Sequence, residues 1–98
     1  MTKKIDINSL PEFDMAEHIK TEADIATYLN IVLEDGDGAE LAHALGVIAR
    51  AKGMADIAQK SGITREALYK ALRPNAQPRF DTVNKVMHAL GVKLHAKA

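Results

Sequence analysis

The stretch ADIAQKSGITREALYKAL, residues 55–72, decides the fold expected for this chain of 98 residues. It holds two short helical patterns, residues 56–60 and a second one after Thr64, separated by a break of about one turn. Gly62 allows the left-handed conformation that ends a helix at low cost. The Thr64 hydroxyl is suited to cap the following helix. A short helix, a glycine-containing turn and a second helix with a polar face are typical of the helix-turn-helix.

The packed centre of this motif is predicted from residue size and polarity. A small residue is needed where the two helices cross, which Ala58 provides, and Gly62 follows in the turn. Apolar residues are needed on either side of the turn. The predicted centre therefore consists of Ile57, Ala58, Gly62, Ile63 and Leu68. Valine at position 62 is expected to strain the backbone and to crowd the turn. The alternative is a pair of packed helices in an all-α domain that binds no nucleic acid.

Residues 55–72 also carry a family resemblance, together with IARAKG (48–53), ATYL (26–29) and PRFDTV (78–83). The chain resembles the addiction-module antidote proteins of the Xre-type, lambda-repressor-like helix-turn-helix superfamily, over roughly residues 13–94. Thr64 stands where many relatives have serine, which preserves a capping hydroxyl. The resemblance implies an antitoxin that represses its own operon, and a small basic partner toxin of the RelE/ParE kind.

Composition points to one all-α domain, a compact bundle of five or six helices. The chain is 47% hydrophobic but only 4% aromatic, which suits aliphatic helix packing. It has no cysteine, no apolar run of membrane-spanning length and no signal-peptide pattern. These features predict a soluble protein of the reducing cytoplasm.

Charge divides the chain into two parts. Residues 1–40 hold three Lys against ten Asp and Glu, and residues 41–98 hold ten Lys and Arg against three Asp and Glu. This asymmetry suggests different partners for an acidic helical extension (1–36) and a basic helix-turn-helix core (37–95). The alternative is a segregation of surface charge without function.

Periodicity predicts the remaining helices. A short one opens at residues 14–17 and runs toward Ile19, and a longer one opens at residues 21–24. Others are expected at residues 39–51 and 81–90, with breaks at 34–38 and 73–79. The expected apolar stripes are Ile25, Tyr28, Leu29, Val32 and Leu33, then Leu41, Ala42, Leu45, Ile48 and Ala49, then Val83, Val86, Met87 and Leu90. Alternation at residues 2–9 and 92–95 allows short terminal strands, or at 2–9 a disordered arm.

DNA recognition follows from the second helix of the motif. Base-reading positions near its N-terminus are Thr64, Arg65, Glu66 and Tyr69, since Arg pairs with guanine and Glu accepts from cytosine. Phosphate contacts are expected from Lys70, Arg73, Gln77, Arg79, Arg50 and Lys52. The alternative for any single one of them is a solvated charge.

Other chemistries find no pattern in the sequence. The four histidines share no ligand spacing, and the carboxylates at residues 34–37 do not complete a calcium loop. No nucleophile–base pair or phosphate-binding glycine loop is present. We therefore expect no enzyme activity, no metal and no cofactor.

Three functional hypotheses remain. The first is an antitoxin that binds double-stranded operator DNA as a homodimer and neutralises a toxin. The second is a stand-alone phage-type repressor without a toxin, and the third is an interaction module that no longer binds DNA. If a toxin binds the acidic part, exposed members of the set Phe13, Ile19, Tyr28 and Leu29 are the candidate anchors, although Tyr28 and Leu29 also suit the core.

Overall fold

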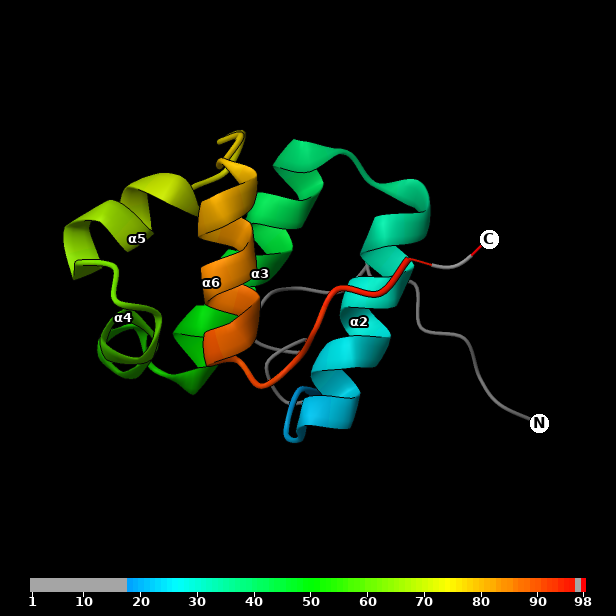
Figure 1. The fold of residues 1–98 in the computed structure, drawn as a ribbon, viewed down its shortest axis with the longest axis horizontal. Coiled ribbons are helices and arrows are strands. Elements are labelled where there is room, and N and C mark those ends of the chain that lie inside the picture. Colours follow the sequence, from blue (N-terminus) through cyan, green and yellow to red (C-terminus); the bar gives the residue numbers. More distant parts are fainter. Residues whose placement is uncertain (1–17, 97) are drawn as a thin grey trace.

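A computed structural model of the chain describes residues 18–96 and residue 98. Five helices, labelled as in Figure 1, follow one another in these residues: α2 (Glu22–Asp35), α3 (Gly38–Lys52), α4 (Met54–Ser61), α5 (Arg65–Ala71) and α6 (Phe80–Ala89). No strand occurs in this described part of the chain. The prediction of an all-α fold is therefore confirmed.

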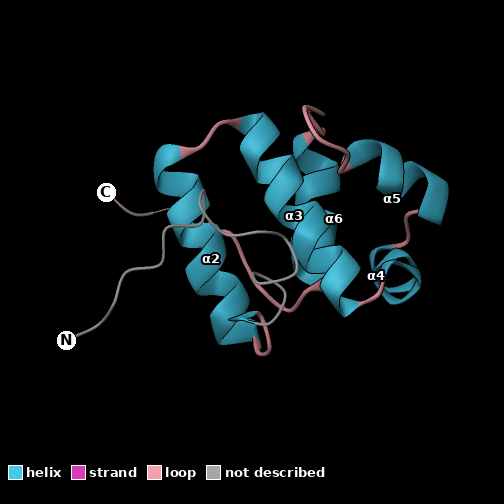
Figure 2. Cartoon of the chain, turned by 180° about the vertical axis from the view of Figure 1, so that it is seen from behind, coloured by secondary structure: helices cyan, strands magenta, loops and turns pink. Residues whose placement is uncertain are grey.

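The central helix is α3, which packs against α2, α4 and α6. Figure 2 shows it between α2 on one side and the other three helices on the other. Its buried residues lie on all sides of the helix: Ala42, Ala44, Leu45, Gly46, Val47, Ile48 and Ala49. A helix that is apolar all round belongs inside a domain. The small residues among them let neighbouring backbones approach closely.

Every helix contributes to one hydrophobic core. The largest side chains with almost no exposed surface are Ile25, Leu29, Leu45, Ile48, Ile57, Leu68, Leu72 and Val86. Within the described residues, no polar or charged residue is buried with them. Removal of this apolar surface from water is the main force that holds the helices together.

Local side-chain caps set where two helices begin. At α2 the Thr21 hydroxyl accepts from the backbone N–H of Asp24 (3.1 Å), and the Asp24 carboxylate accepts from the N–H of Thr21 (3.0 Å). Hydrogen bonds from the backbone N–H groups of Lys20 and Thr21 lower the pKa of Asp24. At α3 the Asp37 carboxylate accepts from the N–H of Glu40 (2.9 Å). The predicted break at 34–38 thus shrinks to residues 36–37, because Glu34 and Asp35 remain helical.

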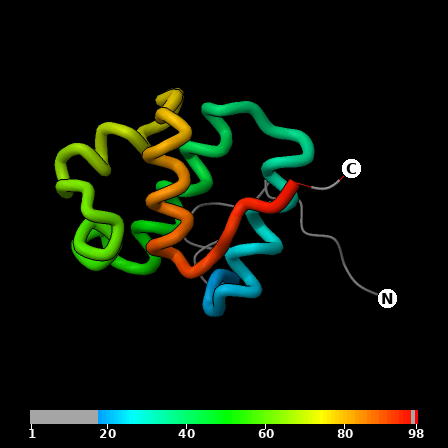
Figure 3. Tube along the Cα trace, in the orientation of Figure 1, coloured from blue at the N-terminus to red at the C-terminus, as the bar shows by residue number. Residues whose placement is uncertain are grey.

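The C-terminal segment differs from the prediction. Residues 92–95 do not form a strand, because the described residues offer no second strand to pair with. They run beside α2 as irregular chain, in red in Figure 3. Leu33, expected in the buried stripe of α2, is 43% exposed. The predicted strand at 2–9 and most of the predicted helix at 14–19 lie outside the described residues.

Candidate nucleic-acid interface

The two faces of α5 differ sharply in burial. Leu68 is fully buried and Leu72, just after the helix, is 1% exposed, so this side is fastened to the core. The opposite side presents Arg65, Glu66 and Lys70 to solvent, with Tyr69 at 45% exposure. The helix lies at one edge of the molecule, on the side away from α2 (Figure 1). A packed helix with a polar outer face has the form needed to enter a DNA groove.

The turn before α5 is closed by the carbonyl of Ala58. This oxygen accepts from the backbone N–H of Gly62 (3.0 Å) and from that of Ile63 (3.2 Å). Gly62 adopts the left-handed conformation, with φ 74° and ψ 17°. Ala58, 8% exposed, faces the core, and Ile63 is partly buried against it. These contacts hold α4 and α5 at a defined angle.

The expected crowding at Gly62 is wrong. A Cβ added there would meet no heavy atom within 4 Å, so only the positive φ opposes a side chain. We expect Gly62→Val to lower the free energy of unfolding by about 2 kcal/mol. Gly62→Asn should cost less than about 1 kcal/mol, because asparagine adopts this conformation readily. Urea denaturation of both variants measures the difference, and equal losses would mean that contacts, not backbone strain, decide this position.

The N-terminal turn of α5 brings three of the predicted base-reading residues onto one surface. The Thr64 hydroxyl oxygen accepts a hydrogen bond from the backbone N–H of Ala67 (3.2 Å), and this bond caps the start of α5. The hydroxyl hydrogen of Thr64 can still be donated to another group. The guanidinium carbon of Arg65 lies 5.8 Å from the centre of the Tyr69 ring. An exposed cation–π contact of this kind contributes about 0.5–1 kcal/mol and restricts the arginine to this side of the helix.

The predicted phosphate contacts fall into two groups. Lys70, Arg73, Gln77 and Arg79 are exposed along α5 and the loop that follows it, residues 73–79. Among the residues that the structure describes, Lys70, Arg73 and Arg79 have no acidic partner. Their charges are therefore available to a polyanion.

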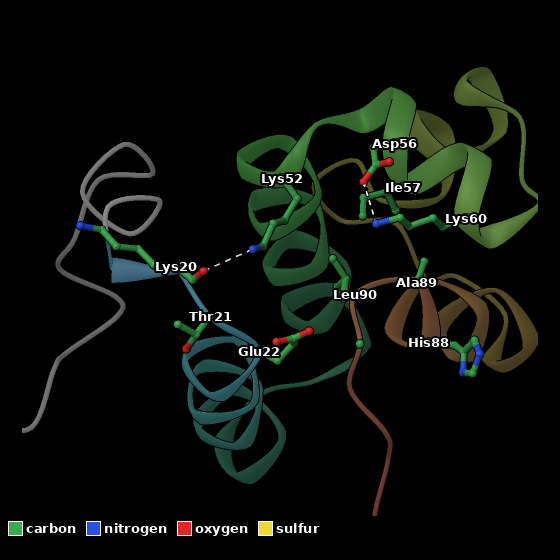
Figure 4. Close-up of a pocket in the computed structure, with 11 residues that line it drawn as sticks. Lys20, Thr21, Glu22, Lys52, Asp56, Ile57, Lys60, His88, Ala89 and Leu90 are labelled. Carbon is green, nitrogen blue, oxygen red and sulfur yellow. Dashed lines mark hydrogen bonds and ion pairs between the residues drawn. The ribbon is translucent and has the colours of Figure 1, made fainter.

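The other two predicted phosphate contacts lie elsewhere. The ammonium nitrogen of Lys52 donates to the carbonyl of Lys20 at the start of α2 (3.4 Å; Figure 4), so the side chain extends toward α2 and not toward α5. One guanidinium nitrogen of Arg50 would be 3.2 Å from a Cβ placed on Gly46, where α3 meets the end of α5. The structure thus does not gather Lys52 with the α5 surface, and it places one end of the Arg50 guanidinium beside Gly46 on α3.

One residue beside this surface was not expected. Phe80, the first residue of α6, is 69% exposed and follows Arg79 directly. Its spacing from Val83 and Met87 is that of a buried stripe, so periodicity alone assigns it to the core. It is exposed because it sits at the end of the stripe, beyond the helices that cover the rest.

The proposed toxin anchors that the structure describes are buried. Ile19 is 5% exposed and Tyr28 is 9% exposed, and both belong to the core, as does Leu29. Neither Ile19 nor Tyr28 offers an exposed side chain to a partner, which corrects that expectation. Phe13 lies outside the described residues.

The described residues also bear on metal sites and membrane spans. They contain no group of three His, Asp or Glu side chains placed to hold a metal ion. None of their helices is long and apolar enough to cross a membrane.

Comparisons with known proteins cover nearly the whole chain. Residues 9–98 match a family model described as "Probable addiction module antidote protein". The chain is also 46% identical over 88 residues to an uncharacterized protein of Haemophilus influenzae, an alignment that covers 90% of this chain and 91% of that protein. No solved structure gives a significant match.

Proposed function

The chain belongs to the family of probable addiction module antidote proteins, and from this premise we propose that it is an antitoxin that binds its toxin and represses its own operon. Family membership supports the antitoxin role and a toxin partner of some kind. The exposed face of α5 supports the repressor role. In this proposal α4 and α5 form the helix-turn-helix of an Xre-type, lambda-repressor-like domain, and the protein acts by binding, without catalysis.

The observation that carries the DNA-binding proposal is the separation of roles on α5. Its inner side is fixed by Leu68 and Leu72, so its outer side is presented with little freedom. Arg65 and Glu66 occupy the first turn, where a helix lying in the major groove meets base edges. Lys70 and Arg73 follow toward the C-terminus, where they would reach phosphates of the same groove.

A homodimer completes the proposal. One recognition helix reads only a few base pairs, and a two-fold dimer places two such helices on a palindromic operator one helical turn apart. The partner on the other side would be a small basic toxin of the RelE/ParE kind. A stand-alone repressor without a toxin is the second candidate, and the antidote family of the chain argues against it.

We expect Arg65→Ala to weaken binding to the operator by about 1–3 kcal/mol and to relax base preference at one position, because a bidentate guanine contact is lost. Fluorescence anisotropy with the chain's own promoter and with scrambled DNA measures both effects. Arg65→Lys should restore the preference only in part, since an ammonium lacks the planar fork of donors with which a guanidinium holds guanine.

Lys70→Ala is the matched control on the same helix. It should weaken binding to both DNAs alike and reduce the salt slope by about one unit, as expected for one phosphate contact. If Arg65→Ala loses the same affinity for operator DNA and for scrambled DNA, Arg65 contacts a phosphate and not a base. No specific binding by the wild type would remove the repressor role and leave the third hypothesis, an interaction module.

A further inference from the structure

A shallow apolar groove lies between α2 and the C-terminal segment. Four residues on one side of α2 line it, spaced three and four apart: Ala26, Leu29, Asn30 and Leu33. Residues 92–95, which run beside α2 in Figures 1 and 3, form the other wall, and Met87 of α6 also contributes. The pocket between them has a volume of about 60 Å³. That is room for the end of one apolar side chain of a partner.

The groove exposes leucines that the fold leaves uncovered. Leu33 is 43% exposed and Leu94 is 37% exposed, one on each wall. The deeper residues Leu29 and Met87 are buried. Burying the exposed parts of both leucines against a partner is favourable, at about 25 cal/mol for each Å² of apolar surface removed from water. The two leucines form a small apolar patch on facing walls of the groove, which a partner's apolar side chain can cover.

On the α2 side, the residues that follow the groove are acidic. Residues 21–49 contain six Asp and Glu and no Lys or Arg. Four of the six follow Leu33 within seven residues and are exposed: Glu34, Asp35, Asp37 and Glu40. On the other wall Lys93 and His95 line the groove, so the acidic side is the α2 side.

The position of two carboxylates makes this charge informative. Glu34 and Asp35 lie in the last turn of α2, which has no basic residue. The helix dipole disfavours anions at this end by about 0.3–1 kcal/mol each. The stability of α2 therefore does not account for them, and exposed carboxylates at this end of α2 complement the charge of a basic partner.

We propose that this groove is the docking site for the toxin, which inserts one apolar side chain between Leu33 and Leu94 while basic residues beside it face Glu34 and Asp35. The inference rests on the proposed antitoxin function and names the surface that performs it. The apolar contact holds the complex, and the carboxylates steer the encounter. The groove lies on α2, and α5 lies at the opposite side of the molecule (Figure 1). The toxin and the operator therefore bind separate surfaces.

The test uses the full chain and the product of the small reading frame next to its gene, the position that the proposed function predicts for the toxin. Isothermal titration calorimetry should show that the double variant Leu33→Ser/Leu94→Ser binds this protein at least about 30-fold more weakly, the loss typical of a central anchor. Glu34→Lys/Asp35→Lys should slow association, with an effect that shrinks in high salt. Phe80→Ser, which removes an exposed apolar side chain outside the groove, should leave toxin affinity unchanged.

The outcomes separate the groove from the function itself. A wild-type chain that binds no product of the adjacent frame would defeat the antitoxin proposal. Full toxin binding by Leu33→Ser/Leu94→Ser would defeat the groove and leave the function standing. If the Leu33→Ser/Leu94→Ser variant has a smaller mass than the wild type in light scattering but keeps its toxin affinity, the groove binds a second copy of the chain. A stability loss in the double variant that disappears when residues 1–17 are deleted would assign it to the chain's own N-terminal segment.

Discussion

Leu68→Ala is expected to lower the free energy of unfolding by about 2–5 kcal/mol, the cost of removing a large buried side chain and leaving a cavity. Leu68 has no exposed surface, and it lies in the middle of α5, a helix of only seven residues. So short a helix is not stable by itself and depends on its packing. The loss is a large part of the 5–15 kcal/mol that such a domain has in total.

Thermal unfolding followed by circular dichroism measures this loss. At about 4–8 °C for each kcal/mol, the melting temperature should fall by roughly 10 °C or more. Leu68→Met, which nearly preserves volume, should cost less than about 1.5 kcal/mol. Lys70→Ala on the exposed face should change stability by no more than about 0.5 kcal/mol. A Leu68→Ala protein that melts within a few degrees of wild type would show that other contacts fasten α5.

Gly46→Val is expected to cost about 3 kcal/mol, at the upper end of overpacking effects. Gly46 is buried in α3, where a Cβ would lie only 2.8 Å from the carbonyl oxygen of Leu72 and 3.6 Å from its Cβ. The opposing atom is backbone at the end of α5, so it cannot move aside as a flexible side chain would. The added side chain must push α5 away from α3, which should also reduce operator binding.

A second glycine on α3 provides the control. Gly38 begins the helix, and a Cβ there would meet nothing within 4 Å. Gly38→Ala should therefore be neutral or slightly stabilising, since alanine is the better helix former. Gly46→Ala should destabilise despite the same propensity gain, because its Cβ alone is too close to Leu72. If the two alanine variants have equal urea midpoints, α3 and α5 do not meet as closely as the structure shows.

Most of the local signals in the sequence predicted the structure well, although the acidic residues 34 and 35 did not end α2 and the alternation at 92–95 did not give a strand. Thr64 caps α5 as expected, and α2 begins within the residues 21–24 that were expected to open it. The hydroxyls of Thr21 and Thr64 each accept a hydrogen bond from the backbone N–H three residues later. Gly62 has the left-handed conformation expected for the end of α4. Such features depend on neighbours a few residues away, so the residue types alone indicate them. The bounds of α3 and α6 are likewise within one residue of those expected from periodicity.

The sequence predicted less well where the answer depended on coverage by distant parts of the chain. Leu33 has the spacing of a buried residue yet is exposed, and Ile19, a candidate for an exposed anchor by sequence, is buried. Lys52 is basic and close to the motif in sequence, but it donates to the carbonyl of Lys20. Leucine and isoleucine occur both in cores and on surfaces, and a lysine can contact either DNA or another part of its own chain. The residue type alone therefore did not distinguish these positions.

The residue pattern alone indicated the all-α class, the ends of α3 and α6 and the turn between α4 and α5, together with the acidic and basic parts of the chain. Only the tertiary structure decided which cations share a surface with α5, that Gly46 makes room for Leu72, and that two leucines remain uncovered beside the acidic end of α2. Hydrophobic periodicity states which side of a helix is apolar, but it does not state how far along that side a neighbouring helix reaches. That length is set by the packing of all the helices together, as Leu33 and Phe80 show at the ends of their stripes.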